Sequence, residues 1–545
     1  MKYARTISGG VVVAPHFLAA EAGARVLGEG GNAIDAMIAA AATIAVVYPH
    51  MNSLGGDNFL LIGDGGKPMA IDACGGAAGQ ASIEFYRSQG LEAIPSRGPL
   101  AALTVAGAVS GWQLALAESK RRGGTLPLSR LFEDAIHHAQ NGTPVSGTLH
   151  RNAAGKLDEL KEVSGFAETF LIDGAAPDEG HNLKLPALAD TFGRLAEVGL
   201  DDFYRGDIAR SMARELEEAG SPLRADDLAQ HKALTVEPLS VRLESGTAYT
   251  LPPPTQGLAS MMILGICERL GVSKAEGFAH VHAIVEASKW AFRVRDRYVS
   301  DPAYMTVDPS DFLTDDRLGQ LAAEIDLEKA LPWPEISQPG DTVWLGAMDR
   351  DGCSVSLIQS IYWEFGSGVV LPETGIVWQN RGTSFSLDSD SHNRLMPGRR
   401  PFHTIHPAMA ALNDGRQMVY GTMGGEGQPQ TQAAIFTRYV DFEQGLEETI
   451  AAPRWLLGRT WGEDSAKLRI ENRFDPAVIG ALRNAGHDIE IVGDFDEMMG
   501  HAGAIVRHTD GAIEAASDPR CDGAAVTDAI YFNSLATRAA LLRRR

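Results

Sequence analysis

Thr342 is the residue whose setting could most directly support chemistry. It follows Pro339-Gly340-Asp341 and opens an apolar run over residues 343–348. If the chain cuts itself between Asp341 and Thr342, the threonine becomes a new N-terminus. Its freed α-amino group would then act as general base for its own hydroxyl, a known way to activate a nucleophile. Most Gly-Asp-Thr sequences simply begin strands, so the local pattern leaves both interpretations open.

The residues after Thr342 predict a β-hairpin. The run 343–348 reaches a turn at residues 349–352 (DRDG) and returns over residues 354–358. Asp-Gly supplies the positive φ angles that a tight turn needs. Thr342 is therefore expected at the start of a core strand, and Ser360 lies further along the return strand.

Glycines further along the chain could hold a developing negative charge. Gly424 and Gly425 follow a predicted strand, and the absence of Cβ atoms would let their backbone N–H groups close on an oxyanion. The alternative is an ordinary strand-to-helix loop. The segment has neither the G-x-G-x-x-G spacing nor the Gly-Lys-Ser/Thr of a phosphate loop, so we expect no nucleotide.

Other motifs of hydrolases and metalloenzymes are missing from the sequence. No G-x-S-x-G or H-E-x-x-H occurs. His280 and His282 stand two apart on a predicted helix, so they point away from each other and are predicted to be structural. His403 and His406 lack a carboxylate at metal-ligand spacing. We expect no metal and no cofactor.

Composition limits the partners and the location. The 545 residues carry a formal net charge of -22, which argues against nucleic acid and disfavours an anionic membrane. The four cysteines form no CxxC pair and are predicted to be buried residues or free thiols in a reducing compartment. The N-terminus shows no secretory signal, and residues 37–48 fall short of the roughly 20 needed for a membrane span. These features predict a cytoplasmic protein.

The order of elements favours two antiparallel sheets stacked between helical layers. Asn32 is a plausible helix N-cap, and hairpins are expected at Asp64-Gly65, Asp414-Gly415 and Asp510-Gly511. Residues 331–341 predict an exposed linker leading to Thr342. Helices are expected over residues 17–27, 33–47, 105–121, 128–140, 187–198, 206–219, 276–298, 428–450 and 475–485.

Motifs on both sides of Thr342 resemble the γ-glutamyltransferase family, whose members are autoprocessed N-terminal-nucleophile (Ntn) hydrolases. The resemblance runs in order from about residue 8 to about 535. Upstream it rests on residues 30–36 (GGNAIDA), 48–50 (YPH), 54–56 (LGG), 252–257 (PPPTQG) and 295–302 (RDRYVSDP). Downstream it rests on residues 349–352, 365–368 (FGSG), 373–376 (ETGI), 385–386, 397–401 (PGRRP), 424–425, 452–454 (APR) and 518–523 (DPRCDG).

This resemblance implies an α+β fold, the four-layer αββα Ntn-hydrolase sandwich. Self-cleavage would give a large subunit, 1–341, and a small subunit, 342–545, which together form one domain and remain a heterodimer. A higher homo-oligomer is left open. Thr342 would first attack the Asp341 carbonyl and later serve as the catalytic nucleophile. Ser360 takes the place of a family threonine that hydrogen-bonds the nucleophile, and Gly424 and Gly425 take that of the oxyanion hole.

Departures from the family pattern concern the substrate. The processing motif, usually Thr-Thr-His-aromatic-Ser, keeps only its nucleophile in residues 342–346 (TVWLG). The arginine that grips the glutamyl carboxylate falls at Cys74. The family residues that bind the glutamyl amino group fall at Arg381 and Ser384, and its paired serines fall at His403 and Thr404. We predict that these four residues, together with the adjoining Asn380, bind the substrate.

A glutamyl group presents an ammonium group and a carboxylate to its pocket. By this comparison, the pocket here has lost the acidic residue that pairs with the ammonium group, and its arginine stands at a different position. Arg381 with His403 favours a carboxylate close to the scissile amide, since arginine recognises carboxylates in a planar, bidentate manner. Arg381 could equally be a surface residue. Hydrolysis of a small acidic amide fits these changes better than γ-glutamyl transfer.

Two branches of the superfamily match that description. Oxamate amidohydrolases release ammonia from a two-carbon amide acid, and cephalosporin acylases remove a dicarboxylic side chain. The missing export signal and residues 48–52 (YPHMN) resemble the oxamate branch. Two alternatives stay open. One is a γ-glutamyltransferase or glutathione hydrolase with a rebuilt pocket. The other is an uncleaved, non-catalytic homologue that binds a small acid or a partner protein.

Overall fold

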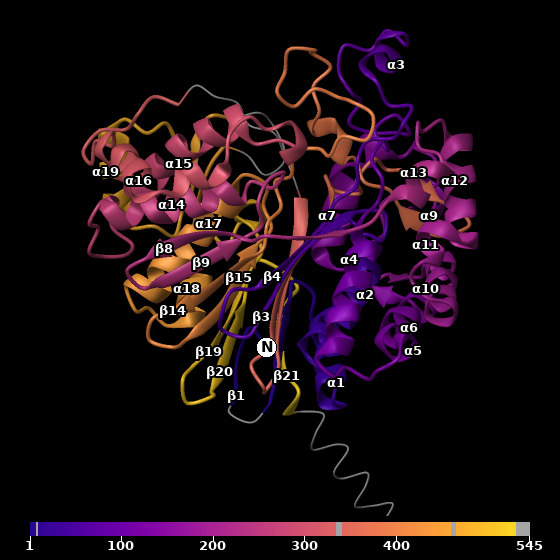
Figure 1. The fold of residues 1–545 in the computed structure, drawn as a ribbon, viewed down its shortest axis with the longest axis horizontal. Coiled ribbons are helices and arrows are strands. Elements are labelled where there is room, and N and C mark those ends of the chain that lie inside the picture. Colours follow the sequence, from indigo (N-terminus) through magenta and orange to yellow (C-terminus); the bar gives the residue numbers. More distant parts are fainter. Residues whose placement is uncertain (7–8, 334–340, 459–464, 530–545) are drawn as a thin grey trace, which may run out of the picture.

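A computed structural model of the protein describes residues 1–6, 9–333, 341–458 and 465–529. Two seven-stranded sheets form the middle of the molecule, and helices cover both outer faces (Figure 1). The prediction of a four-layer α+β sandwich is confirmed. Of the linker predicted over residues 331–341, residues 334–340 lie outside the described part of the chain.

The first sheet carries Thr342. Its neighbouring strands are antiparallel, and β10 and β11 form the hairpin predicted from the Asp-Gly turn. The strand order is β21 (Ala524–Thr527), β2 (Val11–Ala14), β10 (Asp341–Met348), β11 (Ser354–Tyr362), β3 (Asp57–Gly63), β4 (Met69–Ala73) and β7 (Leu234–Val236).

The second sheet packs face to face against the first. Its hairpins at residues 414–415 and 510–511 are also confirmed. The order is β1 (Tyr3–Thr6), β20 (Ile513–Ser517), β19 (Ala502–Arg507), β15 (Gln417–Thr422), β14 (Ala408–Leu412), β9 (Gly246–Thr250) and β8 (Leu239–Leu243). Each sheet takes strands from before and after residue 342, so one hydrophobic core joins the two parts.

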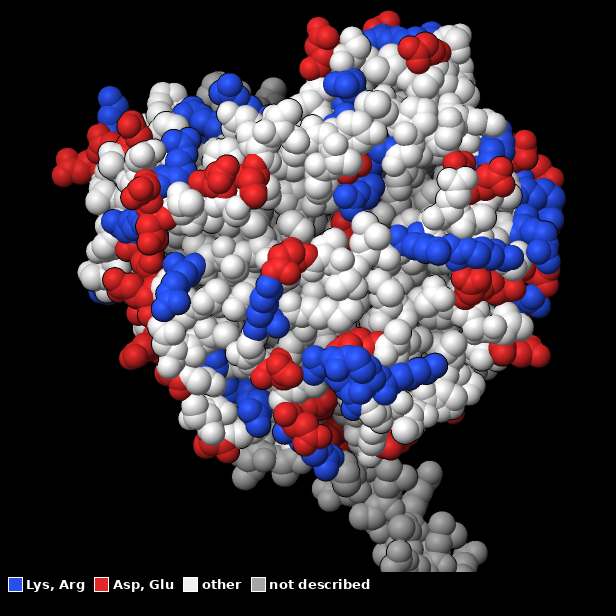
Figure 2. Space-filling model, viewed as in Figure 1, with Lys and Arg blue, Asp and Glu red and all other residues white. Residues whose placement is uncertain are grey.

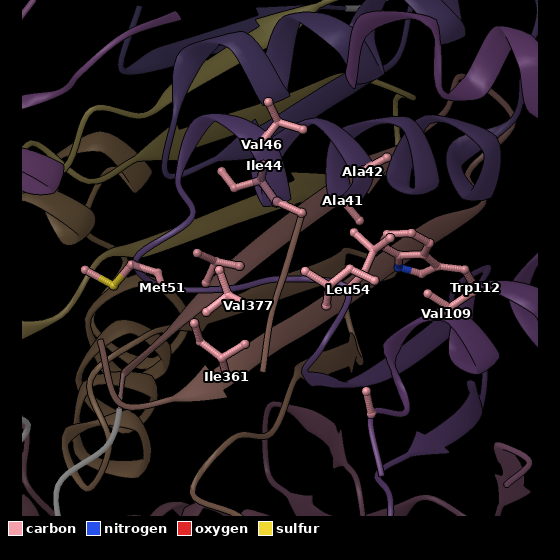
Figure 3. Close-up of a cluster of buried hydrophobic side chains, with 14 of the residues drawn as sticks. Ala41, Ala42, Ile44, Val46, Met51, Leu54, Val109, Trp112, Ile361 and Val377 are labelled. Atoms are coloured by element: carbon pink, nitrogen blue, oxygen red, sulfur yellow. The ribbon is translucent and has the colours of Figure 1, made fainter. Parts of the chain in front are cut away.

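Helix α2 (Ala33–Val47) is the centre of the layer over the first sheet. All of its residues are buried, and Asn32 caps it by accepting hydrogen bonds from the N–H groups of Ile34 and Asp35 at 3.0 Å. Figure 3 shows Ala41, Ala42 and Ile44 of this helix gathered with Leu54, Trp112 and Ile361 in one apolar cluster. This layer also holds α1 (Phe17–Gly28), α4 (Ala108–Arg121), α5 (Leu128–Leu131), α6 (Glu133–Asn141), α10 (Pro186–Val198), α11 (Asp202–Arg205), α12 (Asp207–Ala219) and α13 (Ala225–Gln230).

The helices over the second sheet lie on the left of Figure 1: α14 (Gly257–Arg269), α15 (Phe278–Tyr298), α16 (Asp315–Ala323), α17 (Gly427–Phe436), α18 (Leu446–Ala451) and α19 (Pro476–Ala485). The remaining elements are short. They are α3 (Ile83–Arg87), α7 (Gly147–Gly155), α8 (Leu157–Leu160), α9 (Phe166–Phe170), β5 (Thr143–Pro144), β6 (Asn182–Leu183), β12 (Val370–Leu371), β13 (Ile376–Val377), β16 (Trp455–Leu457), β17 (Leu468–Glu471) and β18 (Ile489–Val492), with single 3₁₀ turns between them.

Two of the expected helices are interrupted. The one over 128–140 breaks at Phe132, whose ring packs into the core against Trp112. The one over 428–450 passes into a π-helical turn, Thr437–Asp441, and stops, since Glu443 has a φ of +55° that no right-handed helix accepts. No helix in the described ranges is long and apolar enough to cross a membrane. On the face drawn in Figure 2, acidic and basic side chains are interspersed.

Trp344 sets the spacing of the two sheets. Its indole lies between them, two residues after Thr342, and its Nε1–H donates to Ser356 Oγ at 3.0 Å. The opposite sheet meets it with glycines. A Cβ on Gly421 would lie 2.2 Å from Trp344 Cδ1, and one on Gly503 would lie 2.4 Å from its Cζ3. The indole therefore occupies the space that side chains would take at these two positions.

We expect Gly421→Ala to lower the melting temperature of the protein, because the added methyl forces Trp344 and its strand to shift. Overpacking of this kind costs about 1–3 kcal/mol. The matched control is Gly480→Ala in α19, where an added Cβ meets nothing within 4 Å. That change should leave the melting temperature equal or slightly higher. Equal melting temperatures for both variants would contradict the spacer role of Trp344.

Candidate active site

Three neighbouring strands of the first sheet bring Thr342, Ser360 and Asp57 to one end of the sandwich. Ser360 of β11 lies directly opposite Asp57 of β3. Between β10 and β11 the register shifts, from the pair Asp341–Tyr362 to the pair Val343–Gln359. Thr342 sits at this irregularity, a type of feature that often re-aims a side chain beside an active site.

Ser360 and Asp57 share the face that looks toward the second sheet, and Thr342 precedes Trp344 of that face at the register shift. Trp344, Ile358 and Phe59 belong to the apolar cluster between the sheets. Thr342, Ser360 and Asp57 each stand two residues from one of them, and side chains alternate faces along a strand. Two strand spacings separate the Cα atoms of Thr342 and Asp57 by about 10 Å. This is the scale of a small molecule with hydrogen bonds at both ends.

The second sheet contributes two loops at the same end. Residues 403–404 precede β14, and residues 424–425 follow β15. The buried Gln256 ties these loops together, because its Nε2–H₂ donates to Thr404 O at 2.5 Å and to Gly425 O at 2.7 Å. Arg295 holds the amide in this orientation by donating from Nη1 to Gln256 Oε1 at 2.9 Å.

Gly424 and Gly425 have the backbone conformation expected of an anion-binding turn. Their φ angles are +119° and +49°, a region that favours glycine. They stand just before helix α17, where backbone N–H groups and the positive end of the helix dipole favour negative charge. The role of oxyanion donors predicted for them is compatible with this geometry.

Arg381 is buried rather than on the surface, with 1% of its area exposed. Its guanidinium carbon lies 3.7 Å from the centre of the Tyr362 ring, and Nη1 donates to Thr404 Oγ1 at 3.3 Å. Nη2 has no hydrogen-bond partner among the described residues. Burial lowers the pKa of Arg381 to about 10, so the side chain keeps its positive charge at neutral pH.

His403 approaches Asp57 from the second sheet. Its Nε2 lies 3.6 Å from Asp57 Oδ2, and its ring packs edge-on against Phe59. Burial, followed by the charges of Arg381 and Arg400, lowers the pKa of His403 well below its usual value, so the imidazole is neutral. The fold therefore places a carboxyl group near His403 that the sequence spacing did not reveal.

Asp57 is the candidate site residue that sequence reasoning missed. Burial raises its pKa to about 7. The comparison with the family had counted no anion in this pocket, and Asp57 adds a carboxyl group to it. An acid directly after Leu54-Gly55-Gly56, followed by Asn58 and then an apolar run, was the signal that could have identified it.

Ser384 and Asn380 take different positions. Ser384 lines a pocket of ≈ 500 Å³ whose walls include Tyr362 and Phe402, and its Oγ donates to Phe402 O at 3.1 Å. Asn380 uses both ends of its amide on the backbone. Nδ2 donates to Ser96 O at 2.9 Å, and Oδ1 accepts from the N–H of Trp363 at 3.1 Å. Ser384 thus faces the approach to the site, while Asn380 supports its walls.

A second arginine near the site is already paired. Arg400 donates to Asp72 at 2.7 Å and to Asp301 at 3.2 Å. Cys74 stands where the family has its carboxylate-binding arginine, and burial raises the pKa of its thiol well above the usual value. Arg381 Nη2 is therefore the cationic donor in this group that the structure leaves available.

One buried cluster elsewhere has the atoms of a metal site. The side chains of His282, Glu286 and His487 lie close together. Lys289 Nζ, however, donates to Glu286 Oε1 at 2.7 Å, and both ring nitrogens of His282 are engaged, with His487 and with the carbonyl of Asp326. The ammonium group already supplies the positive charge there. His280 instead contacts Thr437, so the two histidines do point apart.

Comparison with known proteins agrees with the sequence motifs. A family model described as gamma-glutamyltranspeptidase matches residues 19–528. The chain is 54% identical to the oxamate amidohydrolase proenzyme of Klebsiella pneumoniae, over 95% of this chain and 98% of that protein. It is 41% identical to a glutathione hydrolase-like proenzyme of Bacillus subtilis, over 95% and 98%. A crystal structure of cephalosporin acylase from Bacillus halodurans superposes with a TM-score of 0.88 at 34% identity, covering 96% of this chain and 97% of that one.

The double hydrogen bond from Gln256 gives a testable result. Gln256→Glu keeps the shape but replaces the donor with an acceptor, so the carbonyls of Thr404 and Gly425 lose their partner. We expect a loss of about 1–3 kcal/mol, measured as a lower melting temperature. Gln89→Glu makes the same change at an exposed position and should have no effect. A Gln256→Glu protein as stable as its control would rule out this tie between the loops.

Proposed function

This chain belongs to the γ-glutamyltransferase family of Ntn hydrolases and is an enzyme that acts on C–N bonds, and from that premise we propose its specific reaction. The protein is an autoprocessed N-terminal-threonine amidohydrolase that cleaves a small acidic amide, with oxamate as the leading candidate, through an acyl-enzyme on Thr342. The observation that carries the proposal is the buried Arg381, whose Nη2 is available at the end of the sandwich that holds Thr342.

Maturation begins at the Asp341–Thr342 bond. The Thr342 hydroxyl attacks the Asp341 carbonyl, the peptide C–N bond breaks, and an ester links the two parts of the chain. Breaking the C–N bond frees the Thr342 α-amino group, and water then hydrolyses the ester to give the Asp341 carboxylate and the Thr342 hydroxyl. Because each sheet contains strands from both sides of the cut, the fragments 1–341 and 342–545 stay associated as one αββα domain.

Turnover uses the same hydroxyl with the new amino group as base. The Thr342 Oγ attacks the substrate amide carbon, and the backbone N–H groups of Gly424 and Gly425 stabilise the oxyanion. The C–N bond breaks, ammonia leaves with a proton returned from the α-ammonium group, and water hydrolyses the acyl-enzyme. An oxyanion donor of this kind typically contributes about 3 kcal/mol to the transition state. Ser360 orients the hydroxyl from the neighbouring strand.

The dimensions of the site favour a short acyl group. Tyr362 covers the guanidinium of Arg381, and His403 and Thr404 close the site from the second sheet. Asp57, which lies within electrostatic reach of Arg381, is about two strand spacings, or about 10 Å, from Thr342, so a substrate that reaches from Thr342 to this group is limited to about that width. Monoamides of two to four carbons meet this limit. The name of the 54% identical relative points to the two-carbon member.

One observation favours a second candidate. Asp57 places a carboxyl group near the Arg381 charge, so the pocket could pair with both ends of an α-amino acid. A glutathione hydrolase or γ-glutamyltransferase would use it in that way, and a 41% identical relative is named a glutathione hydrolase-like proenzyme. Release of glutamate from glutathione, or its transfer to a dipeptide, would identify this activity. A cephalosporin-acylase-like enzyme would release a dicarboxylic acid instead.

The first measurement is the intact mass of the purified protein beside its Thr342→Ala variant. We expect two fragments that divide between Asp341 and Thr342, and a single inactive 545-residue chain in the variant. The variant is expected to stay whole because alanine has no hydroxyl to attack the Asp341 carbonyl. A single uncut chain in both samples would favour the non-catalytic binding homologue and remove the basis for the mechanism.

Arg381→Met should raise KM for oxamate roughly tenfold to a hundredfold, since a hydrogen bond to a charged group contributes about 1.5–3 kcal/mol. Cleavage at Thr342 should continue, as shown by intact mass. The control is Arg297→Met. Arg297 is exposed and also stacks on a tyrosine ring, that of Tyr298, at 5.2 Å. An unchanged KM in the Arg381 variant would exclude this residue from substrate binding.

A further inference from the structure

The carboxyl group of Asp57 has one oxygen held by the fold and one directed into the site. Oδ1 accepts hydrogen bonds from the N–H groups of Gly75 at 3.1 Å and Gly107 at 3.0 Å. Oδ2 has no hydrogen-bond partner among the described residues, although only 1% of the residue is exposed. A buried polar atom left in this state normally finds a partner in a ligand or in water.

The backbone arrangement keeps Asp57 in this orientation. Gly56 packs so closely on β11 that a Cβ would lie 2.2 Å from Ser360 O. A Cβ on Gly107 would lie 2.0 Å from Ala73 O. A Cβ on Gly75 would likewise lie 1.8 Å from Val105 O, so both donors reach Oδ1 through backbone that has no room for a side chain, and Oδ2 is left on the side of His403.

The groups around Oδ2 come from four other elements. His403 Nε2 is 3.6 Å away, too far for a hydrogen bond, and neither of its ring nitrogens has a partner among the described residues. Arg381 and the amide of Gln379 lower the pKa of Asp57, and Cys74 and Tyr204 also lie within electrostatic reach. Burial keeps the Cys74 thiol and the Tyr204 phenol neutral by raising the pKa of each.

We propose that Asp57 is a specificity-determining residue that binds the substrate in its protonated form, with Oδ2–H donating a hydrogen bond to the substrate carboxylate beside Arg381. The inference rests on the proposed function and identifies a second group that recognises the acid. The two backbone N–H groups on Oδ1 place the proton on Oδ2, since an oxygen that accepts two hydrogen bonds is the carbonyl oxygen of the acid.

The charges in the site support this protonation state. Without a ligand, the pKa of Asp57 is raised to about 7, because burial outweighs Arg381 and the hydrogen bonds that favour the anion. An arriving carboxylate adds a second negative charge and raises this pKa further. Binding therefore takes up a proton near neutral pH. The affinity is full below the pKa and falls as the pH rises through it.

This arrangement distinguishes an acid from an amino acid. A neutral carboxyl group can donate to a substrate carboxylate, whereas an ionised one would repel it and would bind an ammonium group instead. The pocket then presents one cation, Arg381, and one neutral donor, Asp57, to a single carboxylate. Such a pair selects a small monoanion over a zwitterion of the γ-glutamyl type.

Asp57→Asn tests the proposal because it changes only the oxygen in question. Its carbonyl oxygen can accept from Gly75 and Gly107, and its NH₂ group donates at the Oδ2 position without titrating. The probe is oxalate, which carries the same carboxylate, has a second carboxylate in place of the amide and cannot be hydrolysed; the second charge is the same for both proteins, so it cancels in their comparison. Isothermal titration in two buffers of different ionisation enthalpy measures the protons taken up on binding, from pH 6 to pH 9.

We expect the wild-type protein to lose affinity for oxalate about tenfold per pH unit above the Asp57 pKa. It should also take up close to one proton more than Asp57→Asn at pH 8. The variant should bind within about threefold of wild type at pH 6. Titration of the Thr342 amino group is common to both proteins and cancels in the difference. Intact mass and the melting temperature confirm that the variant is cleaved and folded.

Several results would overturn the assignment. These are equal proton uptake by the two proteins, no binding of oxalate to wild type, or a tenfold or greater loss of affinity in Asp57→Asn at pH 6. The last would mean that Asp57 acts as an anion, as a zwitterionic substrate requires. Ammonia release from oxamate is measured separately. If proton uptake depends on Asp57 but the protein releases no ammonia from oxamate, the proposed function is rejected. The role of Asp57 in carboxylate binding is then still supported.

Discussion

The contact between Trp344 and the glycines of the opposite sheet is the constraint on which the site depends. Two facing sheets normally keep their distance through interdigitating side chains, about 10 Å apart. Here one large ring fills the gap next to Thr342, and Gly421 and Gly503 leave room for it. The ring lies on the same strand as Thr342, so the position of Thr342 relative to the second sheet follows from this packing. The loops at 403–404 and 424–425 belong to that second sheet and inherit the same spacing.

A buried ion network fixes the far side of the loop that holds Gly424 and Gly425. Arg454 pairs with Asp518 at 2.6 Å, and Arg520 pairs with Glu471 at 2.7 Å, all four side chains being buried. The two arginines lower the pKa of Asp518 to about 2, so its charge persists at any ordinary pH. Arg454 also donates to the carbonyl of Gly500, which packs against Met423, the residue before Gly424. The motifs at 452–454 and 518–523 thus carry a supporting role, and breaking such a pair is costly because it leaves a buried charge alone.

The electrostatic character of the pocket follows from burial more than from the number of charges. Arg381 remains cationic although burial lowers its pKa, while His403 becomes neutral and Asp57 titrates near pH 7. The same three residues on a surface would be a cation, a weak base and an anion. Their placement between two sheets converts them into one cation and two neutral hydrogen-bonding groups at moderately acidic pH. The carboxylate of the proposed substrate would therefore meet one cation and two neutral groups.

The sequence by itself determined the elements that depend on local interactions. The Asp-Gly hairpins, the Asn32 cap and the buried helix α2 were predicted because turn geometry, capping and periodicity act over a few residues. The order of motifs around Thr342 also identified the family.

The tertiary structure decided the features that no local sequence pattern predicts. The break at Phe132 accompanies the packing of its ring against Trp112, and Arg381 became a buried residue because Tyr362 and Thr404 enclose it. Asp57 meets His403 across 346 positions of chain, and its pKa is set by the burial that the two sheets create together. The sequence around Asp57 or around His403 does not predict that environment, because it exists only when the two sheets pack together.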